Sequence, residues 1–186
     1  MTSQPSRRSA YSLGSLPNML RSLLVVAFLV AALFAIVPRM SSVDRPAVDA
    51  AAKAGAVAAQ TGWPVELPSR LGEDWVPTVA TYGPGSAEVV TFTTVWKAPG
   101  GDVSLKQARA VSQEWVARTV GDGTSTGKVT IGSRAWERYA ADARGQITYL
   151  LRGTGADDLT IAVTGDIADA ELEGFVRSLR VVAPTS

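Results

Sequence analysis

The sequence contains no cysteine and no histidine among its 186 residues. Without cysteine the chain cannot form disulfides, use a thiol nucleophile or carry a lipid on a cysteine. Without either residue type, every zinc site that is built on thiolate or imidazole is excluded. The absence of histidine also removes the side chain that most often acts as a general base. Any catalysis would therefore depend on carboxylate, hydroxyl or lysine side chains.

Charge is unevenly distributed along the chain. Four of the 18 basic residues (Arg7, Arg8, Arg21 and Arg39) lie in residues 1–40, where there is no acidic residue. Residues 41–186 hold the remaining 14 basic residues and all 17 acidic ones, a net charge of −3. Nucleic-acid binding requires clustered lysine and arginine, so we expect no nucleic-acid partner.

The longest apolar run is Leu23 to Val37, fifteen residues without a polar side chain. As a helix it would extend roughly 22 Å at about 1.5 Å per residue, against a hydrocarbon core of ~30 Å. Met19, Leu20 and Met40 lengthen the run, and the guanidinium of Arg21 can reach the lipid headgroups. The pattern predicts a single transmembrane helix over residues 18–38.

Two other interpretations of this run were weighed. A cleaved signal peptide would need small residues at a cleavage site, and the nearest fit, Leu33–Ala35, begins with a large leucine. A buried core helix would show a polar face, and none is present. Arg7, Arg8 and Arg21 precede the run without acidic neighbours, so the positive-inside rule predicts a cytoplasmic N-terminus. Residues 39–186 would then lie outside the cytoplasm, with the chain in the plasma membrane.

The rest of the chain divides by composition. Residues 1–17 are rich in serine and predict a cytoplasmic tail. Residues 39–60 are rich in alanine and predict a stalk helix that docks through Val48 and Val57; a flexible linker fits equally well. Gly62 and Pro64 end this segment. Residues 61–186 predict one extracytoplasmic domain.

Strands dominate the predicted domain. The first of them, 75–82, contains Pro77, which favours an edge strand or a bulge. Two amphipathic helices are predicted at 107–120 and 169–179. Because regular alternation of strand and helix is missing, we expect an α+β fold, a mostly antiparallel sheet with both helices packed on one face. The further strands are predicted at 88–97, 103–105, 128–131 extending into 135–139, 146–152 and 159–164.

Several short motifs occur in a characteristic order along the chain. Together they resemble the actinobacterial membrane proteins of domain-of-unknown-function family 4245. The resemblance implies an envelope protein of unknown activity, and it supplies no catalytic, cofactor-binding or metal-binding residues. The motifs are Trp63-Pro64-Val65-x-x-Pro68, Leu71-Gly72-x-x-Trp75, Gly132-x-x-x-Trp136-Glu137, and Val163-Thr164-Gly165 before a helix that contains Glu-Leu.

No segment carries a strong catalytic motif. The glycine-rich stretches 121–127 and 153–158 lack the lysine pattern of a phosphate-binding loop, and Asp122 lacks the other ligands of a calcium loop. Ser125 and Lys128 have the spacing of a serine–lysine dyad, but they enter a strand rather than a helix. The paired acids Glu73-Asp74 and Asp157-Asp158 lie in predicted loops, where solvated side chains are the ordinary case. We therefore assign no catalytic, cofactor-binding or metal-binding residue.

Five tryptophans are many for a chain of this size. Their simplest role is in the core or at its rim; the alternative is a ligand-binding patch, for which Trp96-Lys97 is the most exposed candidate.

The sequence thus predicts a non-catalytic binding or protein-interaction module of the cell envelope, held in the bilayer through residues 18–38, with an envelope protein as partner. Its oligomeric state is left open. One alternative is a carboxylate-dependent envelope hydrolase, which needs two acids in a tryptophan-lined cleft. Another is a regulator whose membrane helix binds other helices through the small residues Ala27, Ala31, Ala32 and Ala35.

Overall fold

The computed structural model describes residues 16–36, 47–140, 143–155 and 158–185. The chain separates into two units, one containing the first helix and the other beginning at Arg45. Most of the predicted cytoplasmic tail, the last two residues of the predicted transmembrane helix (37–38) and the first part of the predicted stalk (39–46) lie outside the described residues.

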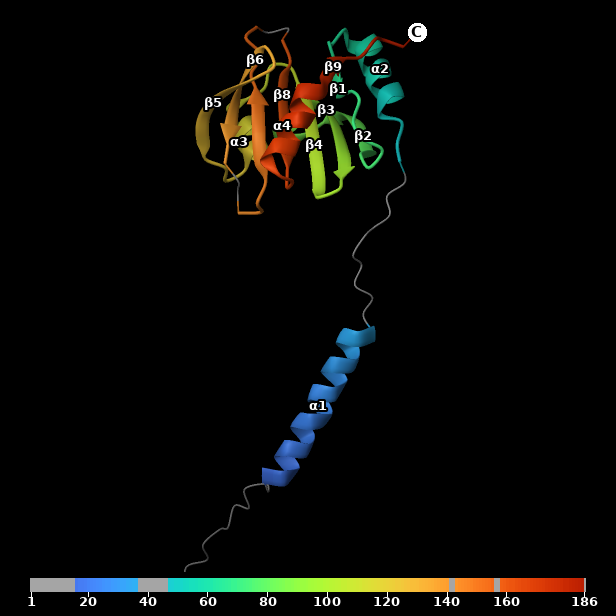
Figure 1. Cartoon of the computed structure of the whole chain (residues 1–186), viewed down its shortest axis with the longest axis vertical. Coiled ribbons are helices and arrows are strands. Elements are labelled where there is room, and N and C mark those ends of the chain that lie inside the picture. Colours follow the sequence, from blue (N-terminus) through green and yellow to red (C-terminus); the bar gives the residue numbers. More distant parts are fainter. Residues whose placement is uncertain (1–15, 37–46, 141–142, 156–157, 186) are drawn as a thin grey trace, which may run out of the picture. The chain divides into compact units, whose positions relative to one another are not determined.

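The first unit contains one helix, α1 (Leu16–Ile36), of 21 residues (Figure 1). The apolar run therefore forms a helix where the sequence predicted one. Its described side chains, at positions 19–30, are all exposed. In the part of the chain that the structure describes, no helix has the length and apolarity needed to cross a membrane.

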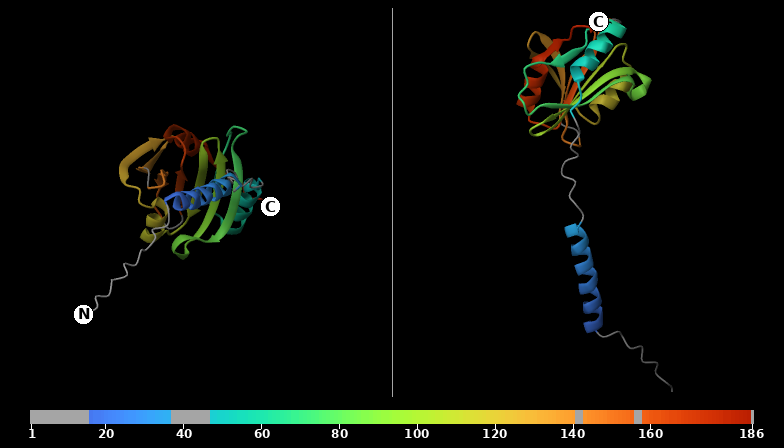
Figure 2. Two further views of the ribbon diagram at one scale, coloured as in Figure 1. Left: turned by 90° about the horizontal axis from the view of Figure 1, so that it is seen from below. Right: turned by 90° about the vertical axis from the view of Figure 1, so that its right-hand side faces the viewer.

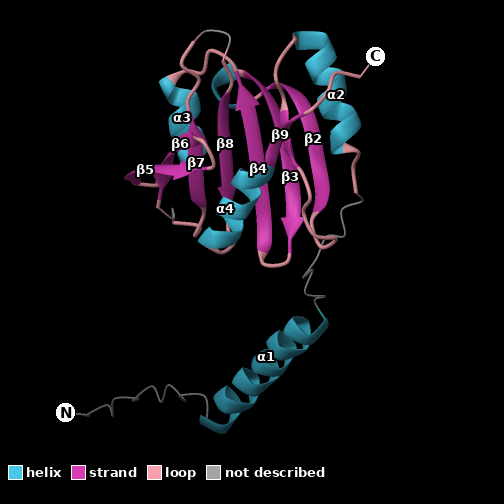
Figure 3. Cartoon of the chain, turned by 45° about the horizontal axis from the view of Figure 1, so that its top comes forward, coloured by secondary structure: helices cyan, strands magenta, loops and turns pink. Residues whose placement is uncertain are grey.

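The second unit is built on a seven-stranded sheet that is antiparallel throughout (Figure 3). An α+β fold with a mostly antiparallel sheet is thus confirmed. A separate two-stranded antiparallel ribbon pairs β1 (Glu66–Pro68) with β9 (Leu179–Val181). In spatial order the sheet contains β2 (Val76–Pro84), β3 (Val90–Ala98), β4 (Gly101–Ala108), β8 (Thr160–Gly165), β7 (Ile147–Leu151), β6 (Arg134–Tyr139) and β5 (Ser125–Ile131).

Two local predictions can be compared with the strands directly. β2 is an edge strand, and its register with β3 shifts between Pro77 and Val79, as expected for a strand that contains proline. The helix predicted from residue 107 was wrong at its start. Gln107 and Ala108 pair with β3 and β8, and α3 (Gln113–Val120) begins only after Ser112, whose hydroxyl caps it.

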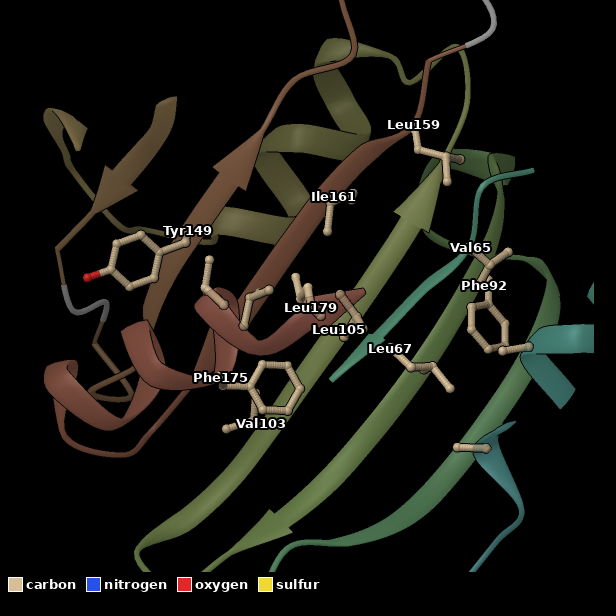
Figure 4. Packing of buried hydrophobic residues seen from close by; sticks show 14 of the residues in the cluster. Val65, Leu67, Phe92, Val103, Leu105, Tyr149, Leu159, Ile161, Phe175 and Leu179 are labelled. Carbon is tan, nitrogen blue, oxygen red and sulfur yellow. The ribbon is translucent and has the colours of Figure 1, made fainter. Parts of the chain in front are cut away.

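The predicted helices do not share one face of the sheet, so that part of the prediction was wrong. α4 (Asp169–Ser178) packs on the first face with β4 and β8 side chains such as Val103 and Ile161 (Figure 4). α3 packs on the second face, where its Trp115 belongs to the same buried cluster as Ala108 and Ala162. The two helices lie on opposite sides of the sheet in the right-hand view of Figure 2. The physical reason is alternation along the strands: successive residues point to opposite faces, and the small alanines let α3 approach the second one.

The alanine-rich segment belongs to the folded unit. α2 (Ala50–Thr61) is capped by Asp49, which accepts a 2.8 Å hydrogen bond from the amide of Ala52, and it ends at the left-handed Gly62. Its inner side joins the first-face core, because Ala54 and Val57 are almost completely buried. The folded domain therefore begins before residue 61 and includes the described part of the predicted stalk.

Candidate binding groove

The tryptophans serve the core and its rim. Trp115 and Trp136 are fully buried, and the other three are partly buried against the first-face cluster. The Trp96 ring lies 6.2 Å from that of Phe175, and its Nε1 donates to the hydroxyl of Thr94. Part of the Trp96 side chain thus packs against the core while the rest stays exposed beside Lys97, and a Trp96-Lys97 binding patch stays a prediction.

The described members of the paired acids lie in loops or turns. Asp158 accepts hydrogen bonds from the hydroxyl and amide of Thr154 and from the amide of Gly155, which together hold its pKa below the usual value. It thus ties its own loop together; its neighbour Asp157 lies outside the described residues. Glu73 and Asp74 are exposed in a turn. Within the described ranges, no three acidic side chains are grouped closely enough to hold a metal ion.

The other candidates are also on the surface. Ser125 and Lys128 are exposed residues of β5, and the Ser125 hydroxyl donates to Glu137 rather than to lysine. Asp122 is exposed in the turn after α3. Among the described residues, no hydrogen bond joins Ser125 to Lys128, and no group of potential metal ligands includes Asp122.

Two hollows lie on the second face: one over β5, β6 and the end of β7, and the other between α3 and β6. The larger has a volume of about 650 Å³ and the smaller about 410 Å³. Arg152, just after β7, lines both, so we call the pair the Arg152 groove. Apolar residues line much of it, namely Leu150 and Leu151 from β7 and Val116, Ala117 and Val120 from α3.

Positive charge predominates around the larger hollow. Lys128, Arg134 and Arg152 line it together with a single carboxylate, that of Glu137. Arg152 Nε donates to Glu137 at 3.2 Å, and its Nη2 donates to the hydroxyl of Tyr139 at 3.4 Å. Because Arg134 pairs with Glu66 and Arg152 with Glu137, Lys128 supplies the net positive charge around the hollow.

Tyr139 lines the smaller hollow, and the pKa of its hydroxyl is raised. Burial, and then the negative charge of Glu137, raise the pKa of its hydroxyl, and Arg152 offsets this in part. The hydroxyl therefore stays protonated at neutral pH and can donate a hydrogen bond. With an apolar lining, guanidinium groups and a phenol, the groove can hold an anionic ligand that has an apolar part.

Sequence reasoning missed this groove. Its residues come from α3, β5, β6 and the end of β7, which are separated by up to about forty positions in the sequence. Each is an ordinary surface or half-buried residue of its own element, so no local pattern distinguishes it. The signal of the groove is a set of charged residues that share the second face, and that face is defined only once the strand order is known.

A third, smaller hollow of about 220 Å³ is lined by two acids, Glu66 and Asp158. Both are already engaged: Glu66 binds Arg134 through both oxygens, at 2.7 and 3.0 Å, and Asp158 holds its loop. No tryptophan lines this hollow or the Arg152 groove. The described residues therefore do not form the tryptophan-lined acidic cleft that the hydrolase alternative requires.

Fold and groove together define a small antiparallel α+β domain with a ligand-sized surface groove. Residues 12–179 match the protein family described as "Protein of unknown function (DUF4245)", and the chain belongs to that family. The resemblance noted from the motifs is thus confirmed, whereas an actinobacterial source stays a prediction. A search of curated proteins found no match.

Proposed function

We propose that the protein is a membrane-tethered, non-catalytic binding or protein-interaction module, with its folded domain outside the cytoplasm. The tether would be α1 and the binding site the Arg152 groove. The observation that carries the tether is the exposed apolar surface of α1: nine large apolar side chains between Met19 and Val30 are 45–75% exposed. A contiguous apolar surface of this kind is typical of a segment that contacts lipid or protein.

The orientation of the tether is supported by the arginine distribution. Arg7, Arg8 and Arg21 lie before or early in the apolar segment without nearby acids, and such residues remain on the cytoplasmic side. Under this proposal the domain that follows is exported and meets envelope components.

The groove supports a binding role through its mixed chemistry. Apolar walls favour a ligand or partner surface with an apolar part, and the net positive charge, which Lys128 supplies, favours a negatively charged group. Carboxylate-dependent hydrolysis needs one acid as proton donor and a second as base or nucleophile. Among the described residues that line the groove, Glu137 is the single acid, and it accepts a hydrogen bond from Arg152.

Photo-crosslinking in intact cells tests the groove. A photoreactive residue replaces Ala135, an exposed residue that lines the larger hollow, and in a matched control it replaces Ala170, an exposed residue of α4. We expect the probe at position 135, and not the one at position 170, to crosslink a discrete envelope component. Adding Arg152→Glu to the position-135 variant should abolish this crosslink. Arg118→Glu reverses the charge of an exposed α3 residue that does not line the groove, so the crosslink should persist in this variant. Equal crosslinking from both positions would contradict the proposal.

Replacing α1 by a polyleucine helix separates this function from the alternative in which the membrane helix itself binds other helices. A simple tether survives the exchange, so the crosslink from position 135 should persist. Loss of the crosslink with the protein still in the membrane would favour specific contacts made by α1.

A further inference from the structure

A fourth hollow, of about 410 Å³, lies beside the β1–β9 ribbon and brings together three arginines from three different elements. Arg134 begins β6, Arg177 lies in the last turn of α4, and Arg180 is the central residue of β9. The carboxylate of Glu66 also lines the hollow. This site goes beyond the Arg152 groove, although Arg134 lines both.

The positive charge of this hollow is only partly neutralised. Glu66 accepts from Arg134 with both oxygens, so its negative charge is already committed to one of the three arginines. In the described part of the chain Arg180 has no carboxylate partner: its Nη1 donates to the backbone carbonyls of Arg177 and Leu179. Arg177 makes only a long 3.4 Å contact with Glu173.

Two of the three guanidinium groups are held in place before any ligand arrives. Arg134 is fixed by its bidentate pair with Glu66 and by the ring of Trp136, 5.2 Å from its guanidinium carbon. Arg180 is fixed by its two carbonyl acceptors, at 2.9 and 2.6 Å. Neither loses much side-chain freedom on binding, which improves affinity. Arg177, whose side chain is 59% exposed, is free to turn toward a ligand.

The donors suit a tetrahedral oxyanion. Each guanidinium offers five N–H groups in a planar fork that matches phosphate oxygens, and fewer than half of those of Arg180 are used. The exposed Ser133, in the turn between β5 and β6, adds a hydroxyl to the same hollow. The volume leaves room for a group attached to the phosphate.

We propose that the hollow formed by Arg134, Arg177 and Arg180 binds a phosphate group, either that of a soluble phosphate ester or that of an anionic lipid headgroup. The chemistry is the same for both sources, because the arginines recognise the phosphate oxygens. The double variant Arg177→Gln/Arg180→Gln removes the two arginines that lack a close carboxylate partner and keeps the Arg134–Glu66 pair.

The matched control is Arg118→Gln. Arg118 forms the same kind of exposed helical pair, with Glu114 four residues earlier, and its side chain is 61% exposed, but it does not line this hollow. It therefore reports the loss of an arginine from the surface without the loss of the site.

The test uses the full chain in maltoside micelles, which contain no phosphate, and follows the arginine Nε–H signals by NMR while inorganic phosphate is added at constant ionic strength. We expect saturable shifts for Arg177 and Arg180. The double variant should bind at least about tenfold more weakly, and Arg118→Gln should bind like the unaltered chain. The single variant Arg177→Gln, at an exposed position, replaces the double variant if the latter does not fold. Absence of saturable shifts, or equal shifts with chloride alone, overturns the proposal.

A second arm distinguishes the two sources. The full chain is placed in lipid nanodiscs of phosphatidylcholine with or without phosphatidylglycerol, and no free phosphate is present. Shifts of Arg177 and Arg180 that need phosphatidylglycerol identify a lipid headgroup. Shifts that appear only when inorganic phosphate is added identify a soluble ligand. Shifts in neither case overturn the site.

Discussion

Tyr149 donates a 2.6 Å hydrogen bond to Oδ1 of Asp169 and so joins the middle of β7 to the first turn of α4. The other oxygen of Asp169 accepts two hydrogen bonds from Arg138 on β6, at 2.7 and 3.2 Å. Burial, followed by the bond to Asp169, raises the pKa of Tyr149 well above its usual value, so that it remains a donor. The three side chains attach α4 to the sheet at the end of the helix that has no side-chain cap.

The first prediction concerns acid. Burial by itself would raise the pKa of Asp169, but the bonds from Tyr149 and Arg138 outweigh it and lower the pKa below 3.8. A carboxyl whose pKa is lower in the folded state stabilises the protein above its unfolded pKa, and this is lost as the pH falls through the folded value. Asp169→Asn should therefore cost about 1 kcal/mol at neutral pH, a modest figure because the side chain is 43% exposed.

The same variant should differ less and less from the unaltered chain as the pH falls below about 4 and then through the lowered pKa of the folded Asp169 carboxyl, below which both side chains are neutral. Urea unfolding measured across this range checks the prediction. Asp74→Asn, an exposed carboxyl in a turn, controls for the loss of one negative charge. A stability difference for Asp169→Asn that is constant with pH would show that the carboxylate charge plays no part.

Gln107 should be essential for holding β1 against the sheet. It is completely buried, and its amide group exchanges two hydrogen bonds, at 2.8 and 2.7 Å, with the backbone N–H and C=O of Glu66. Gln107→Leu has a similar size but leaves both backbone groups without a partner, at a cost of about 3 kcal/mol. Chemical denaturation measures this cost. Ser104→Ala, on the other face of β4, should change stability by well under half as much; equal losses would contradict the assignment.

Two glycines should respond in opposite ways to alanine. A Cβ on Gly165 would lie 2.9 Å from Leu172 Cδ1 and 3.2 Å from Val103 Cγ2, so Gly165→Ala must displace α4 from β8 and should destabilise the domain by about 1–3 kcal/mol. Gly174, on the exposed side of α4, has nothing within 4 Å. Gly174→Ala should therefore stabilise the helix by about 0.5–1 kcal/mol. Melting temperatures decide between these outcomes, and a stabilised Gly165→Ala variant would show that α4 packs less closely than described.

The tether can be tested by placing charges in α1. Each aspartate near the middle of a membrane helix costs about 2.5–3.5 kcal/mol on insertion scales. Leu24→Asp together with Leu29→Asp should thus release the chain from membranes in alkaline carbonate extraction, whereas Leu24→Ile with Leu29→Ile should not. Extraction of the unaltered chain into the soluble fraction would refute the tether itself.

The predictions that succeeded concern features set by residues close together in the sequence. The helix predicted at 169–179 is found as α4, because Leu172, Phe175 and Val176 repeat on one side of a segment that starts with acids. The irregularity of β2 follows from the chemistry of Pro77 alone. Such features depend on neighbours within a few residues, and the sequence displays those neighbours directly.

The features that failed depend on distant partners. β1 and β9 have three residues each and pair Glu66 with Val181, more than one hundred positions apart, so neither strand shows a pattern of its own. The arginine hollow needs that ribbon in place, and the Arg152 groove needs α3 on the second face. The sequence could not predict which face of the sheet α3 covers, because an amphipathic helix can pack on either face.

By itself, the sequence determined the apolar helix, the positions of most strands, the antiparallel α+β class and the absence of thiol and imidazole chemistry. These follow from composition and from contacts between residues close in the chain. Only the tertiary structure decided which face each helix covers, that the alanine-rich segment folds into the core, and which arginines converge. Those outcomes are set by the register and order of strands distant in sequence, where the free energy comes from burying surfaces that no local pattern matches to one another.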